Sequence, residues 1–452
     1  MKLDRTSPPL SGLIAKTAFP KYDTFTVGGI PVYLIENHNQ PYVGVIAYFR
    51  TGATQDNEAT QGLSSFVGEM MTKGTATRTA PEIAEAIDFV GGSLGANAGW
   101  DATTVSISLL KRHLGLGVDL LTDVLRNATF ADEELSRAKM QRLASIQHAK
   151  SDAGYLADTL FTKVHFDGHP YSHEALGTEE SVPTLTSAML KDRYAKYIAP
   201  TNAFLVASGD ITPAEFTELF AERLAGWQSG EQEPKVSAPA NNISSTQIAL
   251  IKKDDAVQSA IRLGHVGIHR AHPDYIPVTV MNVILGGYFN SRINQNLREK
   301  NGFTYGARSY FDARKQTGAF VVSTEVRTEV TRRAVEEILF EMKNLRDGGV
   351  TDDELVMVKN YIVGSFPLSL ETPQQMAGRL ASIPLFELGA DYYDRYIDAV
   401  RSLTKEDINR AAATYLKPDA VLLAVSGNTD VLPSELAGLG EITLYDNNFR
   451  KA

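Results

Sequence analysis

The chain has 452 residues, which is long for one domain and typical of two to four. Its 43% hydrophobic and 22% charged residues are those of a globular protein, and its net charge of −10 argues against a nucleic-acid partner. There is no cysteine, which excludes disulfides, thiolate metal sites and cysteine nucleophiles.

The N-terminal residues favour a cytoplasmic protein. Met1–Pro9 contain an acid and two prolines where a signal peptide would have an apolar core. A periplasmic location would follow if a signal peptide had been removed. No run of about 18 uncharged apolar residues occurs, so we expect no membrane span.

The first half of the chain is predicted to mix strands with helices. Alternation of apolar and polar residues indicates strands, and a period of about 3.6 residues indicates helices. The expected strands are Thr24–Thr26, Pro31–Glu36, Val43–Thr51, Ser93–Ala98 and Thr103–Leu109. The expected helices are Leu63–Thr72, Pro81–Val90, Leu114–Asn127 and Asp132–Ala149.

The second half repeats this mixture. Its expected strands are Thr246–Lys252, Ala260–Gly267, Phe303–Phe311 and Ala319–Glu325. Its expected helices are Tyr275–Ile284, Ser291–Lys300, Thr328–Asp347 and Asp352–Ser365. Strands with helices packed against them indicate an α+β fold.

Two pairs of matching segments indicate an internal duplication. Residues 197–210 and 415–428 share Tyr, Pro, Ser and Gly at a constant offset of 218, and each is predicted as a helix end, a proline turn and a buried strand. Residues 130–135 and 350–355 match at an offset of 220, and each is predicted to place an Asp, Asp132 or Asp352, at a helix N-cap. We therefore predict two homologous halves.

The boundary between the halves is predicted in a polar run that contains proline and has no periodicity. The predicted organisation is an N-terminal domain over residues 1–228, a linker over 229–243 and a C-terminal domain over 244–452. Each domain is expected to be a mainly antiparallel sheet packed with helices.

The predicted helix at Leu63–Thr72 lies in a distinctive frame. Gly62, Phe66, Met70 and the run Lys73-Gly74-Thr75 stand in register with G-x-x-H-F-x-E-H-M-x-F-K-G-T. This segment resembles the zinc helix of the pitrilysin/insulinase-type peptidases. The resemblance covers nearly the whole chain and implies two similar α+β domains that form half of a clam-shell around a peptide-binding cleft.

The residues that do the chemistry in this family are replaced. In H-x-x-E-H, two histidines on one helix face hold zinc, and the glutamate takes a proton from the bound water. Here Ser65, Gly68 and Glu69 stand at these three positions. Ser145 stands where the resemblance places the last ligand, a Glu on a later helix. We therefore expect no metal on this chain and no hydrolysis by the chain alone.

A second motif of the family is intact. Leu297, Arg298, Glu299, Gly302 and Tyr305 fit L-R-E-x-x-G-x-x-Y. Arg298 and Tyr305 are predicted to lie on either side of a helix-to-strand turn, where Asn301-Gly302 ends the helix, so that both side chains converge. The resemblance implies that they donate hydrogen bonds to a substrate carbonyl and stabilise oxyanion charge. Without this frame, the two would be an ordinary exposed helical Arg and a half-buried strand Tyr.

Two other features resemble binding sites. Gly286-Gly287 is expected to allow close backbone approach, not to bind phosphate, since no P-loop lysine follows. His165, His169 and His173 stand four apart, but Gly168 and Pro170 break a helix there, so metal binding is not expected.

Three functions are compatible with these observations. The first is a non-catalytic, substrate-binding subunit of a heterodimeric zinc metallopeptidase, as the resemblance to bacterial heterodimers and to mitochondrial processing peptidase implies. Its partners would be a zinc-bearing homologous chain and a peptide or unfolded polypeptide. The second is a scaffold protein like the respiratory-complex core subunits, and the third is an enzyme with a relocated metal site. A homodimer of the isolated chain remains an alternative.

Overall fold

The computed structural model describes residues 17–234, 236, 243–253 and 256–452. Met1–Pro9, which indicated the location, lie outside the described residues, as do 235 and 237–242 of the predicted linker. The domain boundaries therefore stay predictions. No helix in the described part of the chain is long and apolar enough to cross a membrane.

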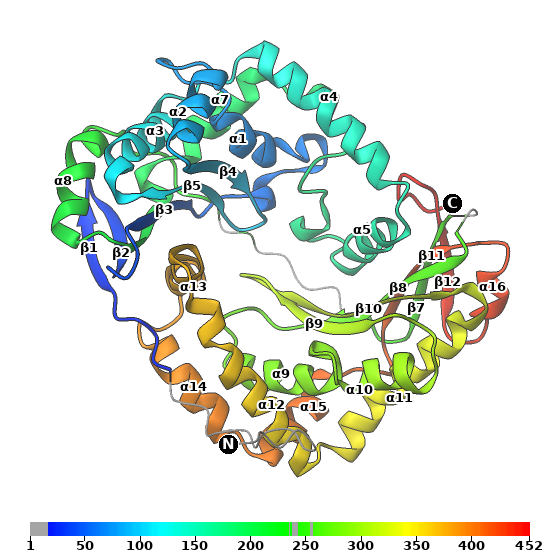
Figure 1. Ribbon diagram of the computed structural model, residues 1–452. Coiled ribbons are helices and arrows are strands. Elements are labelled where there is room, and N and C mark those ends of the chain that lie inside the picture. The colour runs from blue at the N-terminus through cyan, green and yellow to red at the C-terminus, as the bar shows by residue number, and fades with distance from the viewer. Residues whose placement is uncertain (1–16, 235, 237–242, 254–255) are drawn as a thin grey trace, which may run out of the picture.

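Two six-stranded sheets form the framework, one in each half of the chain (Figure 1). The first has the order β1-β2-β6-β3-β5-β4 and the second β12-β7-β11-β8-β10-β9. The first sheet comprises β1 (Asp23–Val27), β2 (Ile30–Glu36), β3 (Tyr42–Phe49), β4 (Ser93–Ala98), β5 (Thr103–Leu110) and β6 (Ala203–Gly209). The second comprises β7 (Gln247–Lys252), β8 (Gln258–Val266), β9 (Ala307–Ala313), β10 (Gly318–Arg327), β11 (Leu422–Gly427) and β12 (Glu441–Tyr445).

Five strands of each sheet follow the same connectivity. β2 pairs in parallel with β6, and β7 pairs in parallel with β11. The other three pairings of these strands are antiparallel in both sheets. Only the outer strand differs, because β1 is antiparallel to β2 whereas β12 is parallel to β7. The fold is thus α+β with two tandem domains, and its shared strand order is the one expected of duplicated halves.

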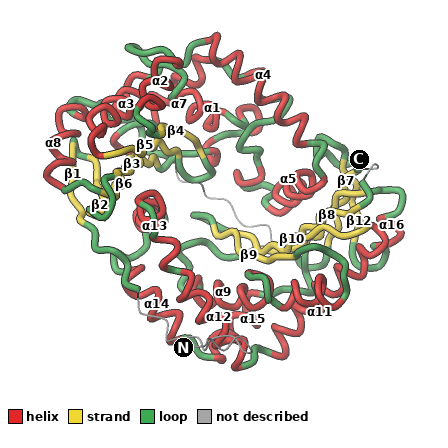
Figure 2. Tube along the Cα trace, viewed as in Figure 1, coloured by secondary structure: helices red, strands yellow, loops and turns green. Residues whose placement is uncertain are grey.

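Helices surround both sheets, and all but α5 and α13 lie outside the space between the sheets, as Figures 1 and 2 show. The first half contributes α1 (Leu63–Met71), α2 (Ala80–Phe89), α3 (Leu114–Asn127), α4 (Asp132–Ala149), α5 (Ala153–His165), α6 (Ser181–Thr184), α7 (Ser187–Tyr197) and α8 (Pro213–Leu224). The second contributes α9 (Tyr275–Asn282), α10 (Arg292–Asn294), α11 (Thr331–Gly348), α12 (Asp352–Ser365), α13 (Pro373–Leu385), α14 (Tyr392–Ser402), α15 (Lys405–Tyr415) and α16 (Leu432–Glu435).

Each half lends one helix to the sheet of the other. α5 packs on β7, β8 and β11 of the second sheet, and α13 packs on β2, β3 and β6 of the first. Both helices lie on the inner faces, between the two sheets (Figure 1). Pro373 begins α13 220 residues after Ala153 begins α5, which is the offset of the repeat. The exchange covers β6 and β11 on both faces, so both strands are buried along their whole length.

The exchanged helices bury apolar side chains. Leu160 and Phe161 of α5 belong to one buried cluster with Ile251 and Ala424 of the second sheet. An ion pair reinforces this contact, because Arg262 of β8 binds Asp158 of α5 through two bonds of 2.5 and 2.9 Å. On the other side, Phe204 and Val206 of β6 share a cluster with Met376, Ala377 and Leu380 of α13. The two halves therefore share their cores.

The predicted helix caps are wrong by one residue. Asp132 and Asp352 are the first helical residues, and Ala131 and Thr351 take the N-cap positions. Thr351 forms a capping box with Glu354, in which each side chain accepts a hydrogen bond from the backbone N–H of the other residue. With Asp352 as the cap, the third helical residue would be Leu355, whose side chain cannot accept such a bond. The two aspartates still lie in the first turn, where the helix dipole favours their charge.

Asp274 at the start of α9 joins this helix to α15, and the strength of the contact should depend on pH. Its carboxylate accepts hydrogen bonds from Arg410 at 2.9 and 3.0 Å and from Tyr415 at 2.7 Å, both on α15. Hydrogen bonding to Arg410, and then to Tyr415, lowers the pKa of Asp274 to about 2. The group therefore stabilises the fold above the unfolded pKa near 3.9, and this contribution is lost as the pH falls toward 2.

We expect Asp274→Asn to lower the free energy of unfolding at pH 7 by about 1 kcal/mol, since Arg410 is half-exposed and the pair is screened. The deficit should shrink between pH 4 and pH 2, as urea unfolding of both proteins would show. Asp391→Asn removes an exposed pair with Arg395 and is the matched control. A deficit that stays constant down to pH 2 would contradict the assignment.

Candidate functional site

The helix predicted to carry the degenerate metal motif is α1, and it is almost fully buried. It begins after Gly62, whose φ of +90° only glycine adopts readily. Ser64 donates its hydroxyl hydrogen bond to Asp56 at 2.7 Å, and the same carboxylate accepts from the backbone N–H of Ser64. Phe66 and Met70 enter the core of the first half. The helix is thus fixed in place by residues that need no metal.

Gly68 stands where the family has its catalytic glutamate, and a side chain has no room there. A Cβ atom at Gly68 would lie 2.7 Å from the carbonyl carbon of Asn97 and 2.8 Å from the backbone nitrogen of Ala98. Both atoms belong to β4, whose backbone cannot move aside as a flexible side chain could. α1 therefore packs on β4 at a distance that only glycine permits.

Arg142 of α4 occupies the position beside the other two motif residues. Its guanidinium donates to a Glu69 carboxylate oxygen at 2.6 Å and to the Ser65 hydroxyl at 3.2 Å. It also donates to the Leu176 carbonyl at 2.6 Å and lies 4.7 Å from the centre of the Phe66 ring. A cationic side chain thus stands against the two residues that replace the histidines.

These residues do not fit a zinc ion. Ser65 and Glu69 already bind the Arg142 guanidinium, and Gly68 has no side chain that could act as a base. Ser145, placed at the last ligand position, lies exposed on α4 one turn beyond Arg142. Within the ranges that the structure describes, no three His, Asp or Glu side chains gather as a metal site would require. We derive no step of chemistry through a metal on this chain.

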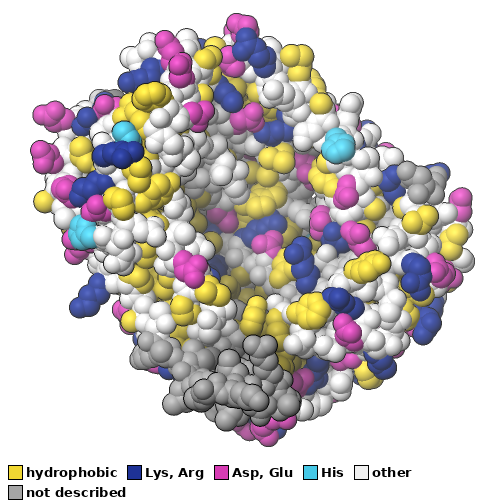
Figure 3. Space-filling model, in the orientation of Figure 1, with side chains coloured by type: hydrophobic (Ala, Val, Ile, Leu, Met, Phe, Trp, Pro, Cys, Tyr) yellow, Lys and Arg dark blue, Asp and Glu magenta, His cyan; other side chains and the backbone are white. Residues whose placement is uncertain are grey.

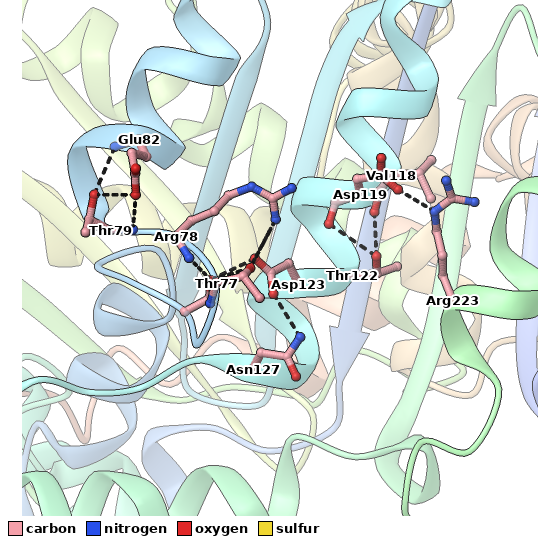
Figure 4. A network of polar contacts seen from close by, with 11 residues as sticks. Thr77, Arg78, Thr79, Glu82, Val118, Asp119, Thr122, Asp123, Asn127 and Arg223 are labelled. Carbon is pink, nitrogen blue, oxygen red and sulfur yellow. Dashed lines mark hydrogen bonds and ion pairs between the residues drawn. The ribbon is translucent and has the colours of Figure 1, made fainter.

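The loop that follows the motif has a structural role that needs no metal ligand. Thr75 donates to Asp123 of α3 at 2.7 Å, and Thr77 and Arg78 donate to the same carboxylate oxygen at 2.8 and 2.7 Å. Asn127 donates to the other oxygen at 2.8 Å. Figure 4 shows this buried carboxylate at the centre of the network. The loop after α1 is therefore tied to α3.

Arg298 of the intact motif lies in a π-helical turn, Gln295–Lys300, that continues α10. The sequence predicted one regular helix here; the observed turn is wider, with the Asn301 N–H bonded to the Asn296 carbonyl five residues back. The segment is held by Arg292, which binds Glu354 at 2.7 and 2.8 Å. Arg298 is therefore presented from an anchored element.

Tyr305 lies in a loop, not in the strand predicted at Phe303–Phe311. The strand β9 begins at Ala307, because the N–H of Gly302 and of Phe303 still bonds to the preceding helical turn. Thr304 then closes a local turn by accepting from the N–H of Gly306 at 3.1 Å. The loop leaves the Tyr305 side chain 93% exposed.

Arg298 and Tyr305 line one hollow of about 610 Å³ on the second half. Its other walls come from the Gly286–Phe289 turn and from β8, β9 and β10. The close approach predicted for the paired glycines is present, since a Cβ at Gly286 would lie 2.4 Å from the Ser309 hydroxyl. The space-filling view in Figure 3 shows the molecule hollowed between its halves.

The Arg298 guanidinium is oriented by its neighbours but keeps hydrogen-bond donors that no neighbour among the described residues uses up. It lies 4.6 Å from the centre of the Phe289 ring, and its Nε stands 3.3 Å from Glu299. Its side chain is 37% exposed, so its terminal nitrogens can donate to a ligand. The Tyr305 hydroxyl can do the same. The hollow therefore presents two hydrogen-bond donors, one of them charged, to a carbonyl or an oxyanion.

Two further residues escaped the sequence analysis. Arg142 stands three residues before Ser145, the predicted position of the last zinc ligand, and its basic side chain was the available signal. Arg262 forms part of the hollow's floor and is buried against Asp158. No spacing indicates that pair, because it joins different halves of the chain. His165 ends α5 and His169 follows the Gly168 turn, so the three histidines do not share one helix face, and burial lowers the pKa of His165 to about 4.

Two α+β domains, a peptidase-type helix frame and an ion pair in place of the metal ligands define an inactive relative of the zinc peptidases. Residues 31–179 match the family model of insulinase (peptidase family M16), and residues 184–362 match that of the peptidase M16 inactive domain. The chain belongs to this family, the pitrilysin/insulinase-type peptidases.

Individual relatives agree with this assignment. The uncharacterized zinc protease YmxG of Bacillus subtilis is 25% identical over 88% of this chain and 96% of its own. The structure of a peptidase M16 inactive domain from Pseudomonas fluorescens is 27% identical, with a TM-score of 0.85 over 90% of this chain and 98% of that one. A protease from Helicobacter pylori, 18% identical with a TM-score of 0.83 over 90% of this chain and 99% of that one, shares the fold.

Proposed function

We propose that this chain is the non-catalytic, substrate-binding subunit of a heterodimeric zinc peptidase. One contrast supports the proposal: Arg142 binds two of the residues that replace the zinc motif, whereas Arg298 and Tyr305 stay open to solvent in one hollow. A chain without its own zinc has no internal use for donors aimed at a substrate carbonyl. A homologous chain with an intact H-x-x-E-H helix would supply the metal.

In this proposal the two donors act across the interface. A peptide bound in the hollow would place a carbonyl oxygen against the Arg298 guanidinium and the Tyr305 hydroxyl. Both groups would stabilise the negative charge that develops on that oxygen when water attacks, and a charged donor gives the stronger bond. Phe289 holds the guanidinium in place beneath this position, which limits the reorganisation needed.

The proposal is tested by mixing this chain with a homologous chain that carries the intact zinc helix. Only the mixture should cleave a quenched fluorescent peptide, and a chelator should abolish the cleavage. Arg298→Ala and Tyr305→Phe should each lower kcat/KM of the mixture by about 10²-fold or more, the loss typical of one oxyanion donor. Arg327→Ala, an exposed arginine beside Glu329 outside the hollow, is the matched control.

Full activity of the Arg298→Ala and Tyr305→Phe mixtures would overturn the proposed role of the pair. Failure of the mixture to bind and cleave, with the chain in a stable complex that lacks any zinc-bearing chain, would favour a scaffold instead. A native gel or light scattering of the mixture separates loss of association from loss of catalysis.

A further inference from the structure

The hollow around Arg298 and Tyr305 is rich in arginine, although the protein as a whole is negatively charged. Its charged lining residues are Arg262, Arg298, Arg308 and Glu325, whereas the chain as a whole carries a net charge of −10. A local excess of guanidinium groups in a concave surface attracts anions and repels cations. This contrast suggests what kind of substrate the hollow accepts.

Three residues form a row across the floor. In the strand register, Ser323 of β10 stands opposite Arg308 of β9 on one side and Arg262 of β8 on the other. Side chains directly opposite in neighbouring strands share one face of a sheet. The face is the one turned toward the hollow, because the next residue, Ser309, points to the other face and donates to Asn282 of α9. A small serine thus separates two arginines.

The two arginines of this row differ in whether a carboxylate neutralises their charge. Arg262 is buried, and Asp158 neutralises it through two short bonds. Arg308 is exposed at the edge strand, and its guanidinium lies 5.8 Å from the Tyr310 ring without an ion pair to any described residue. Arg262 is therefore part of the fold, while Arg308 is available to a ligand beside Arg298.

We propose that this hollow selects peptides that carry a carboxylate close to the carbonyl held by Arg298 and Tyr305, and that Arg308 is the residue that recognises it. The inference rests on the proposed function. A guanidinium matches the two oxygens of a carboxylate with paired hydrogen bonds, which an ammonium or an amide does not reproduce. The carboxylate can belong to an Asp or Glu side chain or to the C-terminus of the peptide.

Equilibrium binding to the isolated chain tests the inference without zinc or a second chain. Fluorescence anisotropy would compare labelled peptides that differ at one position, Asp against Asn, and a second pair with a free or an amidated C-terminus. We expect the carboxylate peptide of at least one pair to bind about threefold to fivefold tighter, as an exposed charge pair allows. Raising the salt should erase most of this preference.

The variants assign the preference to one residue. Arg308→Gln should abolish it, Arg308→Lys should retain part of it, and Arg327→Gln, on β10 outside the hollow, should leave it unchanged. The pair of peptides that shows the preference identifies its source, side chain or C-terminus. Equal affinities within both pairs, an intact preference in Arg308→Gln, or no binding of any peptide would overturn the inference.

The inference and the proposed function can fail separately. If the mixed chains cleave equally well with Arg298→Ala or Tyr305→Phe, the pair has no catalytic role, whatever peptide affinities the anisotropy measurement gives. Conversely, cleavage that depends on the pair, with Asp and Asn peptides bound and cleaved alike, would remove only the carboxylate preference.

Discussion

Neither half of this chain should fold when it is expressed alone. Residues 1–234 would lack α13, so Phe204 and Val206, both fully buried in the whole chain, would face water, and α5 would have no sheet to cover. Burial of each large apolar side chain contributes about 1.5–3 kcal/mol, against a total stability of about 5–15 kcal/mol. The loss of a whole helix interface therefore removes most or all of the stability.

The measurement is thermal unfolding followed by near-ultraviolet circular dichroism. The isolated half should show no cooperative transition, and co-expression of both halves should restore one. Within the whole chain, Leu380→Ala on α13 should cost about 2–5 kcal/mol because Leu380 is fully buried. Leu368→Ala is the control, since Leu368 is 58% exposed. A cooperative transition in the isolated half would show that the exchanged helix is dispensable.

Rebuilding the family motif on α1 should not create a zinc site. The triple variant Ser65→His, Gly68→Glu and Glu69→His would force a side chain against the β4 backbone and would leave Arg142 without its carboxylate. Overpacking at Gly68 and the loss of the partner of a half-buried cation together should lower the free energy of unfolding by about 2–3 kcal/mol. The position of the last ligand would still hold Ser145, so one coordinating group would be missing.

Metal analysis of the purified variant and urea unfolding check this result. Zinc should stay well below one ion per chain, even after Arg142→Ala is added to remove the competing cation. Gly68→Ala isolates the steric effect and should be destabilising by itself. Gly115→Ala is its matched control, because a Cβ there meets open space in a helix. One tightly bound zinc ion in a stable variant would contradict the close packing of α1 on β4.

Much of the secondary structure followed from periodicity. The strands β1 to β5 and the helices α1 to α4 lie within a few residues of their predicted ranges, because each buries one regular face. Helices α5 and α13 were not predicted, although they carry the exchange between halves. Their burial depends on strands of the other half, which no local pattern reports. The strand predicted to follow the Asn301-Gly302 helix stop included Tyr305, whereas a turn closed by Thr304 delays the strand to Ala307.

The candidate site divides in the same way. The identities of Ser65, Gly68 and Glu69 alone excluded the zinc chemistry of the family, because ligand chemistry depends on residue type and spacing. The motif that contains Arg298 and Tyr305 could also be recognised from its residue types and spacing. The contact of Arg142 with Ser65 and Glu69, and the lack of room beside β4 at Gly68, became visible only in the folded chain.

The tertiary structure likewise decided that Arg308, rather than Arg262, keeps a free charge in the hollow. The family, the missing ligands and most of the strands and helices could be read from the residues alone, since these depend on residue type and local periodicity. The ion pairs Arg142–Glu69 and Arg262–Asp158 join residues 73 and 104 positions apart. Such contacts form only when distant segments pack together, so they depend on the packed fold and not on any run of residues.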